Sequence, residues 1–331
     1  MPSLQQFPRM DTMNVLVTGG CGFIGSHLVR RLMKSGARVA IATRDTTNAW
    51  RLKDVIHEIN CYPVDVRHAH QVEACVKNVR PHLIFHMAAY GVDPRQANVS
   101  DAVATNVMGT VNILEAARIH QVTRVVNLGS SSEYGDVQEA VTEEAPLEPL
   151  DIYGSTKAAA TIIAHQQARA HHLSLITLRP FGVFGEYEAS HKLFTYVITS
   201  ALQHHAITLT MCEQSRDYCY VENVIDGLLL AAITPQVREA IFNIGTGSVR
   251  PLREYIDLIL RFLPTTAKPT YGALPPRNNE RWSPHPDVRQ IHTQLGWKPH
   301  VSVEDGIAQT VAWFVKNCPQ LTTWYPIEGS M

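Results

Sequence analysis

The sequence lacks a long hydrophobic run, a cluster of basic residues and any paired set of cysteines. No apolar stretch in its 331 residues reaches the length that spans a bilayer. The first twelve residues, MPSLQQFPRMDT, contain no apolar core of a secretory signal. The formal net charge is −1 and Lys and Arg are dispersed, which argues against nucleic acid as a partner. We therefore expect a cytoplasmic protein with no membrane and no nucleic-acid partner.

Metal-binding patterns are also missing. The six cysteines are scattered and form no C-x-x-C pair, which excludes the usual zinc spacings. Histidine is frequent, but adjacent pairs such as His171–His172 point to different sides of a helix and are poor chelates. We expect no metal site, and thiols that pack as small hydrophobic side chains.

What is present is an alternation of strand-like and helix-like segments over the first 180 residues. We predict strands at residues 14–20, 38–43, 61–66, 82–89, 124–130 and 174–180, with helices at 26–36, 107–118 and 156–172. The alternation predicts an α/β fold, a Rossmann-type doubly wound parallel sheet with helices on both faces. After Pro180, prolines and short segments indicate a smaller, irregular C-terminal domain, closed by an amphipathic helix at 302–317.

A glycine-rich stretch, VTGGCGFIGSHL, lies between the first predicted strand and the first predicted helix. It places Gly19, Gly22 and Gly25 at a G-x-x-G-x-x-G spacing, with Phe23 and Ile24 before the last glycine. In this context a dinucleotide pyrophosphate sits on the helix N-terminus, and the glycines allow a tight turn and close packing. The stretch is therefore a candidate dinucleotide-binding loop.

The end of the second predicted strand indicates which dinucleotide binds. A carboxylate there binds the 2′-hydroxyl of NAD, whereas an arginine accommodates the 2′-phosphate of NADP. This chain has Thr43-Arg44-Asp45, with Arg51 nearby. Arg44 favours NADP(H) over NAD(H), and Asp45 keeps NAD(H) as the alternative.

Tyr153 and Lys157, in DIYGSTKAA, are one helical turn apart at the start of a predicted helix. A lysine cation beside a phenol favours the phenolate and lowers its pKa. The pair is therefore a candidate acid/base group for use near neutral pH.

Five motifs occur together, in the order VTGGCGFIGSHL, NVMGTVNILEAAR, YGSTKAAA, RDYCYVENVIDGL and HTQLGWKPHVSVEDGI. With this set, spread between Met13 and Phe314, the chain resembles the extended short-chain dehydrogenase/reductase family of NAD(P)-dependent nucleotide-sugar epimerases, dehydratases and reductases. The resemblance implies an NAD(P)-binding Rossmann domain at residues 13–180 plus about 217–247. It implies a nucleotide-sugar-binding domain at about 181–216 plus 248–320.

Cofactor-binding residues are also implied by the resemblance. Asp65 and Val66 match the pair that meets the adenine. Ala88 and Ala89 match the loop along the cofactor, and Asn106 matches the asparagine beneath it.

The resemblance assigns catalytic roles in the same way. Tyr153 would exchange a proton with the sugar, and Lys157 would bind the nicotinamide ribose and tune the tyrosine. Counting back from Tyr134-Gly135 places the substrate-binding hydroxyl on Ser130. Related 4,6-dehydratases carry an acidic pair or a glutamate at the next two positions, where this chain has two serines that are substrate-binding candidates.

Those two candidates are Ser131 and Ser132. Glu133 follows one position too late to match a dehydratase acid, so we interpret it as a loop carboxylate or a hydrogen-bonding partner.

The segment RPFGVFGEYE departs from the family pattern. Gly182 stands where the family has a substrate-contacting asparagine, and Phe184 where it has a tyrosine, with the cofactor candidate Val183 between them. We expect the missing amide to widen the pocket. Arg216 matches an arginine that contacts the nucleotide diphosphate; Arg281 is a second candidate, with simple solvent exposure as the alternative.

The favoured function is hydride transfer at C4 of a nucleotide-diphosphate hexose, as in 4-keto-6-deoxyhexose reductases. NAD-dependent 4-epimerisation is the alternative, followed by 4,6-dehydration and by a non-catalytic redox-sensing binder. The resemblance also implies a homodimer, through the helix that carries Tyr153 and Lys157 and the helix after Asn106.

Overall fold

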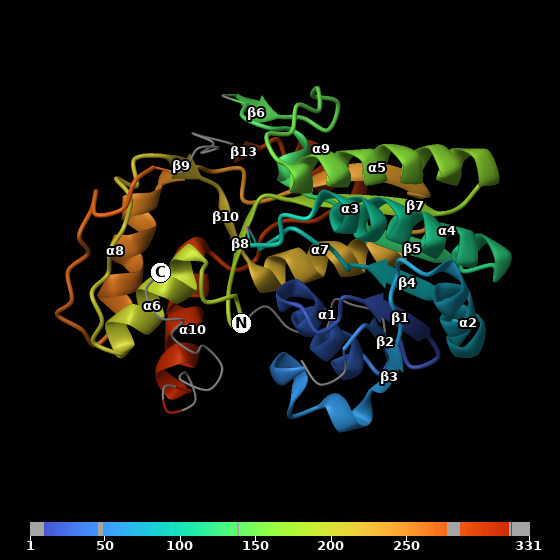
Figure 1. Cartoon of the computed structure of the whole chain (residues 1–331), viewed down its shortest axis with the longest axis horizontal. Coiled ribbons are helices and arrows are strands. Elements are labelled where there is room, and N and C mark those ends of the chain that lie inside the picture. Colours follow the sequence, from blue (N-terminus) through green and yellow to red (C-terminus); the bar gives the residue numbers. More distant parts are fainter. Residues whose placement is uncertain are drawn as a thin grey trace.

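A central parallel sheet organises the chain (Figure 1). The computed structural model describes residues 10–45, 49–93, 95–137, 139–276, 285–317 and 319. Within these ranges the sheet has seven strands in the order β11-β7-β5-β4-β1-β2-β3. Their bounds are β1 (Asn14–Thr18), β2 (Arg38–Thr43), β3 (Asn60–Pro63), β4 (Leu83–His86), β5 (Arg124–Leu128), β7 (Leu175–Pro180) and β11 (Glu239–Ile244). The predicted Rossmann-type sheet is confirmed, and the six predicted strands all belong to it.

Helices cover both faces of this sheet. The helices α2 (Ala69–Val79), α4 (Gly109–Ile119) and α5 (Ile152–His171) pack on one face, and α1 (Phe23–Lys34) and α7 (Val221–Ile233) pack on the other. Along β1, Val15 and Val17 belong to the core cluster that contains Leu28 of α1, while Leu16 belongs to the one that contains Ile113 of α4. Strands that are apolar on both sides are typical of a parallel sheet between two helical layers.

Three further helices form a second group beyond the carboxyl edge of the sheet. The helices α6 (Leu193–Leu202), α8 (Leu252–Phe262) and α10 (Val303–Lys316) pack together (Figure 1). Small two-stranded sheets join β8 (Gly182–Phe184) to β10 (Tyr218–Tyr220), β9 (Ser215–Arg216) to β12 (Arg250–Pro251), and β6 (Ala140–Val141) to β13 (His285–Pro286). The short helical elements are η2 (Trp50–Leu52), η3 (Ile56–Glu58), α3 (Val99–Ala102), the π-helix η4 (Val103–Met108), η5 (Ser131–Glu133) and α9 (Arg289–Leu295). The division into two domains stays a prediction.

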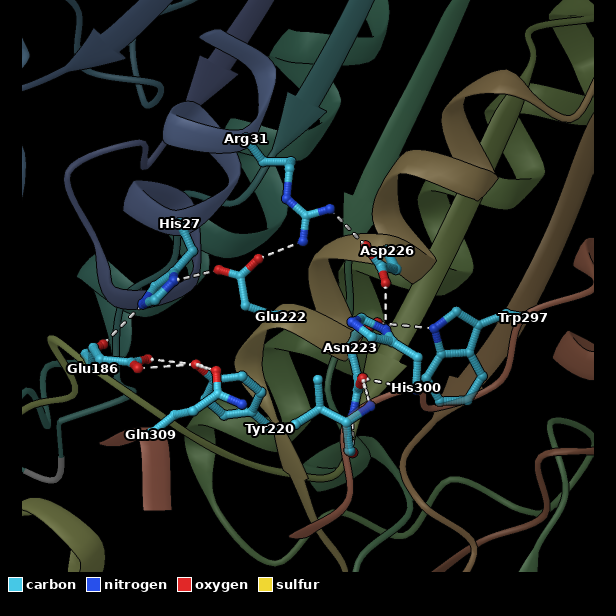
Figure 2. A network of polar contacts seen from close by, with 11 residues as sticks. His27, Arg31, Glu186, Tyr220, Glu222, Asn223, Asp226, Trp297, His300 and Gln309 are labelled. Atoms are coloured by element: carbon cyan, nitrogen blue, oxygen red, sulfur yellow. Dashed lines mark hydrogen bonds and ion pairs between the residues drawn. The ribbon is translucent and has the colours of Figure 1, made fainter. Parts of the chain in front are cut away.

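A network of ion pairs ties α1 to α7 and to the C-terminal segment (Figure 2). Glu222 of α7 lies 2.9 Å from Nδ1 of His27 and 2.5 Å from a guanidinium nitrogen of Arg31. Arg31 also contacts Asp226 at 3.0 Å, and Asp226 lies 2.7 Å from Nδ1 of His300. Burial alone would raise the pKa of Glu222, but His27 and Arg31 outweigh it and hold that pKa at about 2. The helix that follows the glycine loop is therefore fixed by charged residues from distant parts of the chain.

No helix in the described ranges is both long enough and apolar enough to cross a membrane.

Candidate active site

The glycine loop connects β1 to α1 in the way the sequence predicts. Gly19 has φ +67°, and a Cβ there would lie 2.7 Å from the backbone of Met87 and Ala88. A Cβ on Gly25 would lie 2.2 Å from the carbonyl oxygen of Gly19, so only glycine lets the helix pack so closely on the turn. Gly22 is the N-cap residue of α1, whose first amides have no intrahelical acceptor. The loop can therefore present backbone N–H groups to a pyrophosphate.

A buried histidine stabilises the neighbouring strand end. Nδ1 of His86 lies 2.8 Å from the hydroxyl oxygen of Thr18, and its Nε2 lies 3.1 Å from that of Thr110. Burial, together with the nearby charge of Lys157, lowers the pKa of His86 to about 3, so the ring is neutral. The Thr18 hydroxyl in turn accepts hydrogen bonds from the N–H groups of Met87 and Ala88.

These hydrogen bonds end β4 at His86, short of the predicted residue 89. Ala88 and Ala89 consequently lie in a half-buried loop beside Gly19. Sequence reasoning did not identify the role of Thr18 or His86. The available signal was a polar residue at the end of each of two otherwise apolar strands.

The predicted adenine-binding residues lie beyond β3. The Asp65 carboxylate accepts hydrogen bonds from the Arg67 guanidinium, and Arg67 also contacts Asp101 at 2.8 Å. Burial opposes ionisation of Asp65, but Arg67 outweighs it and lowers the pKa of that carboxyl. Val66 is buried under Gly109 at the start of α4. A fixed carboxylate at this strand end is a suitable hydrogen-bond acceptor for a nucleoside.

The two arginines near the end of β2 differ in their surroundings. The Arg44 side chain is exposed just after the strand. Arg51 instead donates a hydrogen bond to the carbonyl of Tyr187 at 2.8 Å, and its guanidinium lies 4.4 Å from the ring centre of Trp50. Of the pair, Arg44 therefore has the more exposed side chain, and its contact with a ribose 2′-substituent stays a prediction.

Asn106 lies in the π-helix η4 and is almost completely buried. Its Oδ1 accepts a hydrogen bond from the N–H of Tyr90 at 2.8 Å, and its Nδ2 donates to the carbonyl of Tyr90 and to the hydroxyl of Thr156. Asn106 thus joins the loop after β4 to the helix that carries Lys157. Isolated π-helical turns are frequent at functional sites, and the sequence carried no signal for this one.

Tyr153 and Lys157 lie in the first two turns of α5. The helix begins at Ile152, earlier than the predicted residue 156, because the Asp151 carboxylate accepts a hydrogen bond from the N–H of Gly154 and caps it. The Lys157 ammonium is buried and donates to the carbonyl of Leu128, at the end of β5, at 2.5 Å. Burial lowers the pKa of Lys157, and the negative charge of Glu133 opposes this shift.

Ser130 follows β5 and begins the short helix η5. Its backbone is extended, its Oγ accepts a hydrogen bond from the N–H of Ser132, and its own N–H donates to Oε1 of Glu133. The carbonyl of Ser132 lies against Gly154, where a Cβ would be only 2.4 Å away. The turn formed by Ser130, Ser131 and Ser132, called the serine turn below, therefore packs on the first turn of α5. This brings Ser130 to the N-terminal end of the helix, where Tyr153 and Lys157 lie. Ser131 is buried and Ser132 is half-buried.

Glu133 points away from solvent, with a fully buried side chain. Its Oε2 accepts a hydrogen bond from Nε of Arg179, on β7, at 2.8 Å. Oε1 accepts from the hydroxyl of Thr161 at 3.2 Å as well as from Ser130. Burial raises the pKa of Glu133, and the charges of Arg179 and Lys157 counteract this. The interpretation of Glu133 as a hydrogen-bonding partner is confirmed.

The expectation that Gly182 widens the pocket is wrong. Strand β8 pairs with β10 in a register that sets Gly182 opposite Tyr218. A Cβ on Gly182 would lie 2.5 Å from the Tyr218 ring and 2.5 Å from the carbonyl of Asp217. The aromatic ring therefore takes up the space that a side chain at position 182 would need. The neighbouring Val183 is half-buried in β8.

Of the two arginines predicted to bind phosphate, only Arg216 lies within the described residues. Arg216 is half-buried in β9, where its carbonyl accepts a hydrogen bond from the Tyr255 hydroxyl and its guanidinium donates to Ser215. Arg281 lies outside the described residues. Across the described ranges, no three His, Cys, Asp or Glu side chains are grouped so that they could hold a metal ion.

Comparisons with known proteins extend over most of the chain. A family model described as the NAD dependent epimerase/dehydratase family matches residues 15–245. The UDP-glucose 4-epimerase of Mycolicibacterium smegmatis is 30% identical over 313 residues, which cover 91% of this chain and 98% of that protein. The dTDP-glucose 4,6-dehydratase of Haemophilus influenzae is 28% identical over 337 residues, which cover 92% and 98%. The crystal structure of the Thermus thermophilus UDP-glucose 4-epimerase complexed with NAD has a TM-score of 0.81 and 28% identity, covering 92% of this chain and 99% of that one.

Proposed function

Because the chain belongs to the NAD-dependent epimerase/dehydratase family, we propose that it uses NAD(H) to interconvert the two C4 epimers of a nucleotide-diphosphate hexose. The observation that carries the proposal is the convergence of Ser130, Tyr153 and Lys157 where η5 packs on the start of α5. The relative at 30% identity is a UDP-glucose 4-epimerase, which makes a UDP-hexose the first substrate to test.

The glycine loop fits the proposed cofactor. Gly19 and Gly25 leave room where any Cβ would collide with backbone, and the N-terminus of α1 faces the same turn. A nicotinamide dinucleotide held by this loop would supply hydride-transfer chemistry at C4 of the sugar. We choose NAD(H) over the NADP(H) that Arg44 predicts, because the similar Thermus structure contains NAD. The comparisons give no support to NADP(H).

The chain's own residues would handle the proton. Tyr153, as the phenolate, would accept the proton of the C4 hydroxyl while the hydride leaves, and would return it during re-reduction. The buried Lys157 ammonium favours that phenolate through its positive charge. The Ser130 hydroxyl would donate a hydrogen bond to the C4 oxygen, which stabilises charge that develops there.

Dehydration at C5 and C6 needs an acid that faces the sugar. The carboxylate nearest the serine turn, Glu133, is fully buried and bound by Arg179, Thr161 and the backbone of Ser130. Ser131 and Ser132 stand at the two positions where the resemblance leads us to expect acids in a dehydratase. We therefore infer that elimination of water is not the net reaction.

Net reduction of a 4-keto sugar is the second candidate. It would use the same three side chains, and the exposed Arg44 at the end of β2 is the observation that favours it. A reductase exchanges its cofactor in every turnover, whereas an epimerase can retain it.

We also propose the two-domain division stated above, with the nucleotide sugar held by the second domain, including Arg216.

Mass spectrometry distinguishes these reactions. We expect the protein, purified without added cofactor, to carry NAD, and to convert UDP-glucose to a product of equal mass that migrates as the C4 epimer. A product heavier by two hydrogens, formed from a 4-keto sugar with NADPH, would instead support the reductase. Loss of water from the nucleotide hexose would contradict both.

We propose a homodimer with its interface on the α3, η4 and α5 surface. These adjacent elements expose large apolar side chains, namely Val99, Val103, Met108, Ile152, Ile162 and Ile163. Exposed apolar area of this kind marks protein-protein contacts. We expect light scattering to show a dimer that Ile162→Glu converts to a monomer.

The control for that variant is Phe262→Glu, which changes an exposed apolar residue on α8 instead. It should remain dimeric. A wild-type protein that is monomeric at micromolar concentration would contradict the proposal.

A further inference from the structure

Glu133 and Arg179 form a buried ion pair that the proposed reaction does not use directly. Their side chains are 0% and 2% exposed, and Nε of Arg179 lies 2.8 Å from Oε2 of Glu133. A second guanidinium nitrogen donates to the Tyr134 hydroxyl at 2.7 Å, and the guanidinium lies 4.7 Å from that ring's centre. The Tyr134 hydroxyl in turn donates to Oδ1 of Asn243, on β11, at 2.8 Å. The pair is therefore held by the η5 turn and by two strands of the sheet, β7 and β11.

Burying two charges is unfavourable unless each is well paired, and apolar side chains of equal size are often as stable. This pair nevertheless lies directly behind Ser130, which points to a role other than stabilising the fold. The ion pair with Arg179 uses Oε2 of Glu133. Any further role of this side chain therefore depends on the groups that its Oε1 contacts.

Oε1 contacts both Ser130 and the helix α5. It accepts a hydrogen bond from the N–H of Ser130 at 2.9 Å and from the hydroxyl of Thr161 at 3.2 Å. Thr161 lies one turn after Lys157 on α5, and the Lys157 ammonium donates to the carbonyl of Leu128, two residues before Ser130. A Cβ on Gly129 would lie 2.8 Å from Oε1, so the carboxylate lies directly under this turn.

We propose that Glu133, held by Arg179, is a positioning residue for the active site: its carboxylate fixes the backbone of Ser130 and lies beneath the turn whose Leu128 carbonyl the Lys157 ammonium contacts. This inference rests on the proposed function and adds to it. The carboxylate touches neither sugar nor cofactor, and acts through Ser130 and Lys157.

The charge balance supports this role. Burial lowers the pKa of Lys157, and Glu133 is the group that opposes the shift. Within the described structure, the titratable groups that act on the pair or on a direct neighbour of it are Lys157 and His165 on α5, Tyr134 after η5, Glu143 after β6 and, through Lys157, His86 on β4. His86 is neutral, and Glu133 is the carboxylate bonded to the serine turn.

The test is the pH profile of turnover. Glu133→Gln keeps the shape and the acceptor for Ser130 but removes the charge, so Lys157 should lose its proton at lower pH. We expect the alkaline limb of the profile to move down by on the order of one pH unit. Glu133→Asp keeps the charge but shortens the side chain, so the limb should stay while turnover falls.

Glu143→Gln is the matched control. Glu143 is a half-buried carboxylate that accepts a hydrogen bond from the N–H of Asn243, but the contacts of its carboxylate do not include Ser130 or Lys157 within the described structure. Its profile should match that of the wild type. An unshifted limb in Glu133→Gln, or an equal shift in the control, would overturn the inference.

Two further measurements cover the remaining outcomes. If Glu133→Gln does not fold, the Glu133→Asp variant tests the positioning role instead. Unchanged turnover in that variant would contradict the positioning of Ser130 by Glu133. NADH fluorescence titrations against pH follow the Lys157 proton without any sugar. A wild type that binds NADH but turns over no nucleotide hexose would refute the proposed function alone, while this titration still tests Glu133.

Discussion

Tyr153→Phe is expected to lower turnover of the nucleotide hexose by about 10²- to 10⁴-fold, the usual contribution of a positioned acid/base group. The variant loses the hydroxyl that exchanges the C4 proton, but keeps the ring that packs against Gly91. Cofactor binding should therefore stay close to that of the wild type. The measurement is the initial rate of epimer formation at saturating sugar, together with an NADH titration.

A tyrosine elsewhere provides the control for this variant. Tyr196 lies on α6, and its hydroxyl contacts Thr208 rather than the serine turn or α5. Tyr196→Phe should retain turnover within a few-fold. If Tyr153→Phe also retained it, the assignment of the proton exchange to Tyr153 would be wrong.

Arg179→Met is expected to lower the free energy of unfolding by about 3–5 kcal/mol at pH 8, because it leaves the Glu133 carboxylate buried without its cation. The effect should depend on pH. Burial raises the pKa of Glu133 and Arg179 counteracts that rise, so the pKa is higher still without Arg179, and the cost of the substitution grows as pH rises from the folded pKa of the wild type toward that of the variant. Denaturant titrations at pH 5 and pH 8 should therefore show a larger loss at pH 8.

The double variant Glu133→Gln, Arg179→Met isolates the charge. It removes both ions, so it should be more stable than Arg179→Met alone at pH 8 and should lose the pH dependence. An equal loss for the single variant at both pH values would mean that lost packing, and not the unpaired carboxylate, explains the effect.

Much of the fold and part of the site were predictable because the signals are local. The glycine spacing from Gly19 to Gly25 and the one-turn spacing of Tyr153 and Lys157 depend only on neighbouring residues. Both lie where expected in the structure, at the N-terminus of α1 and the start of α5.

The remaining features depend on which strands become neighbours. Glu133 and Arg179 are 46 residues apart and meet only because β5 and β7 are adjacent in the sheet. The ring of Tyr218 fills the space beside Gly182 because β8 and β10 pair in one particular register. No periodicity in a single segment reports such a partner, so sequence reasoning treated Glu133 as minor and expected a wider pocket at Gly182.

The outermost strand, β11, imposes an order on synthesis of the chain. It pairs with β7 along Leu175–Pro180, yet its residues 239–244 leave the ribosome only after α6 and α7. Until then the edge of β7 is open, and until α7 has emerged α1 also lacks the helix that packs on it. Open strand edges and bare apolar faces are where nascent chains associate wrongly. While the segment between β7 and β11 is being translated, the nascent chain therefore exposes a strand edge that could pair wrongly.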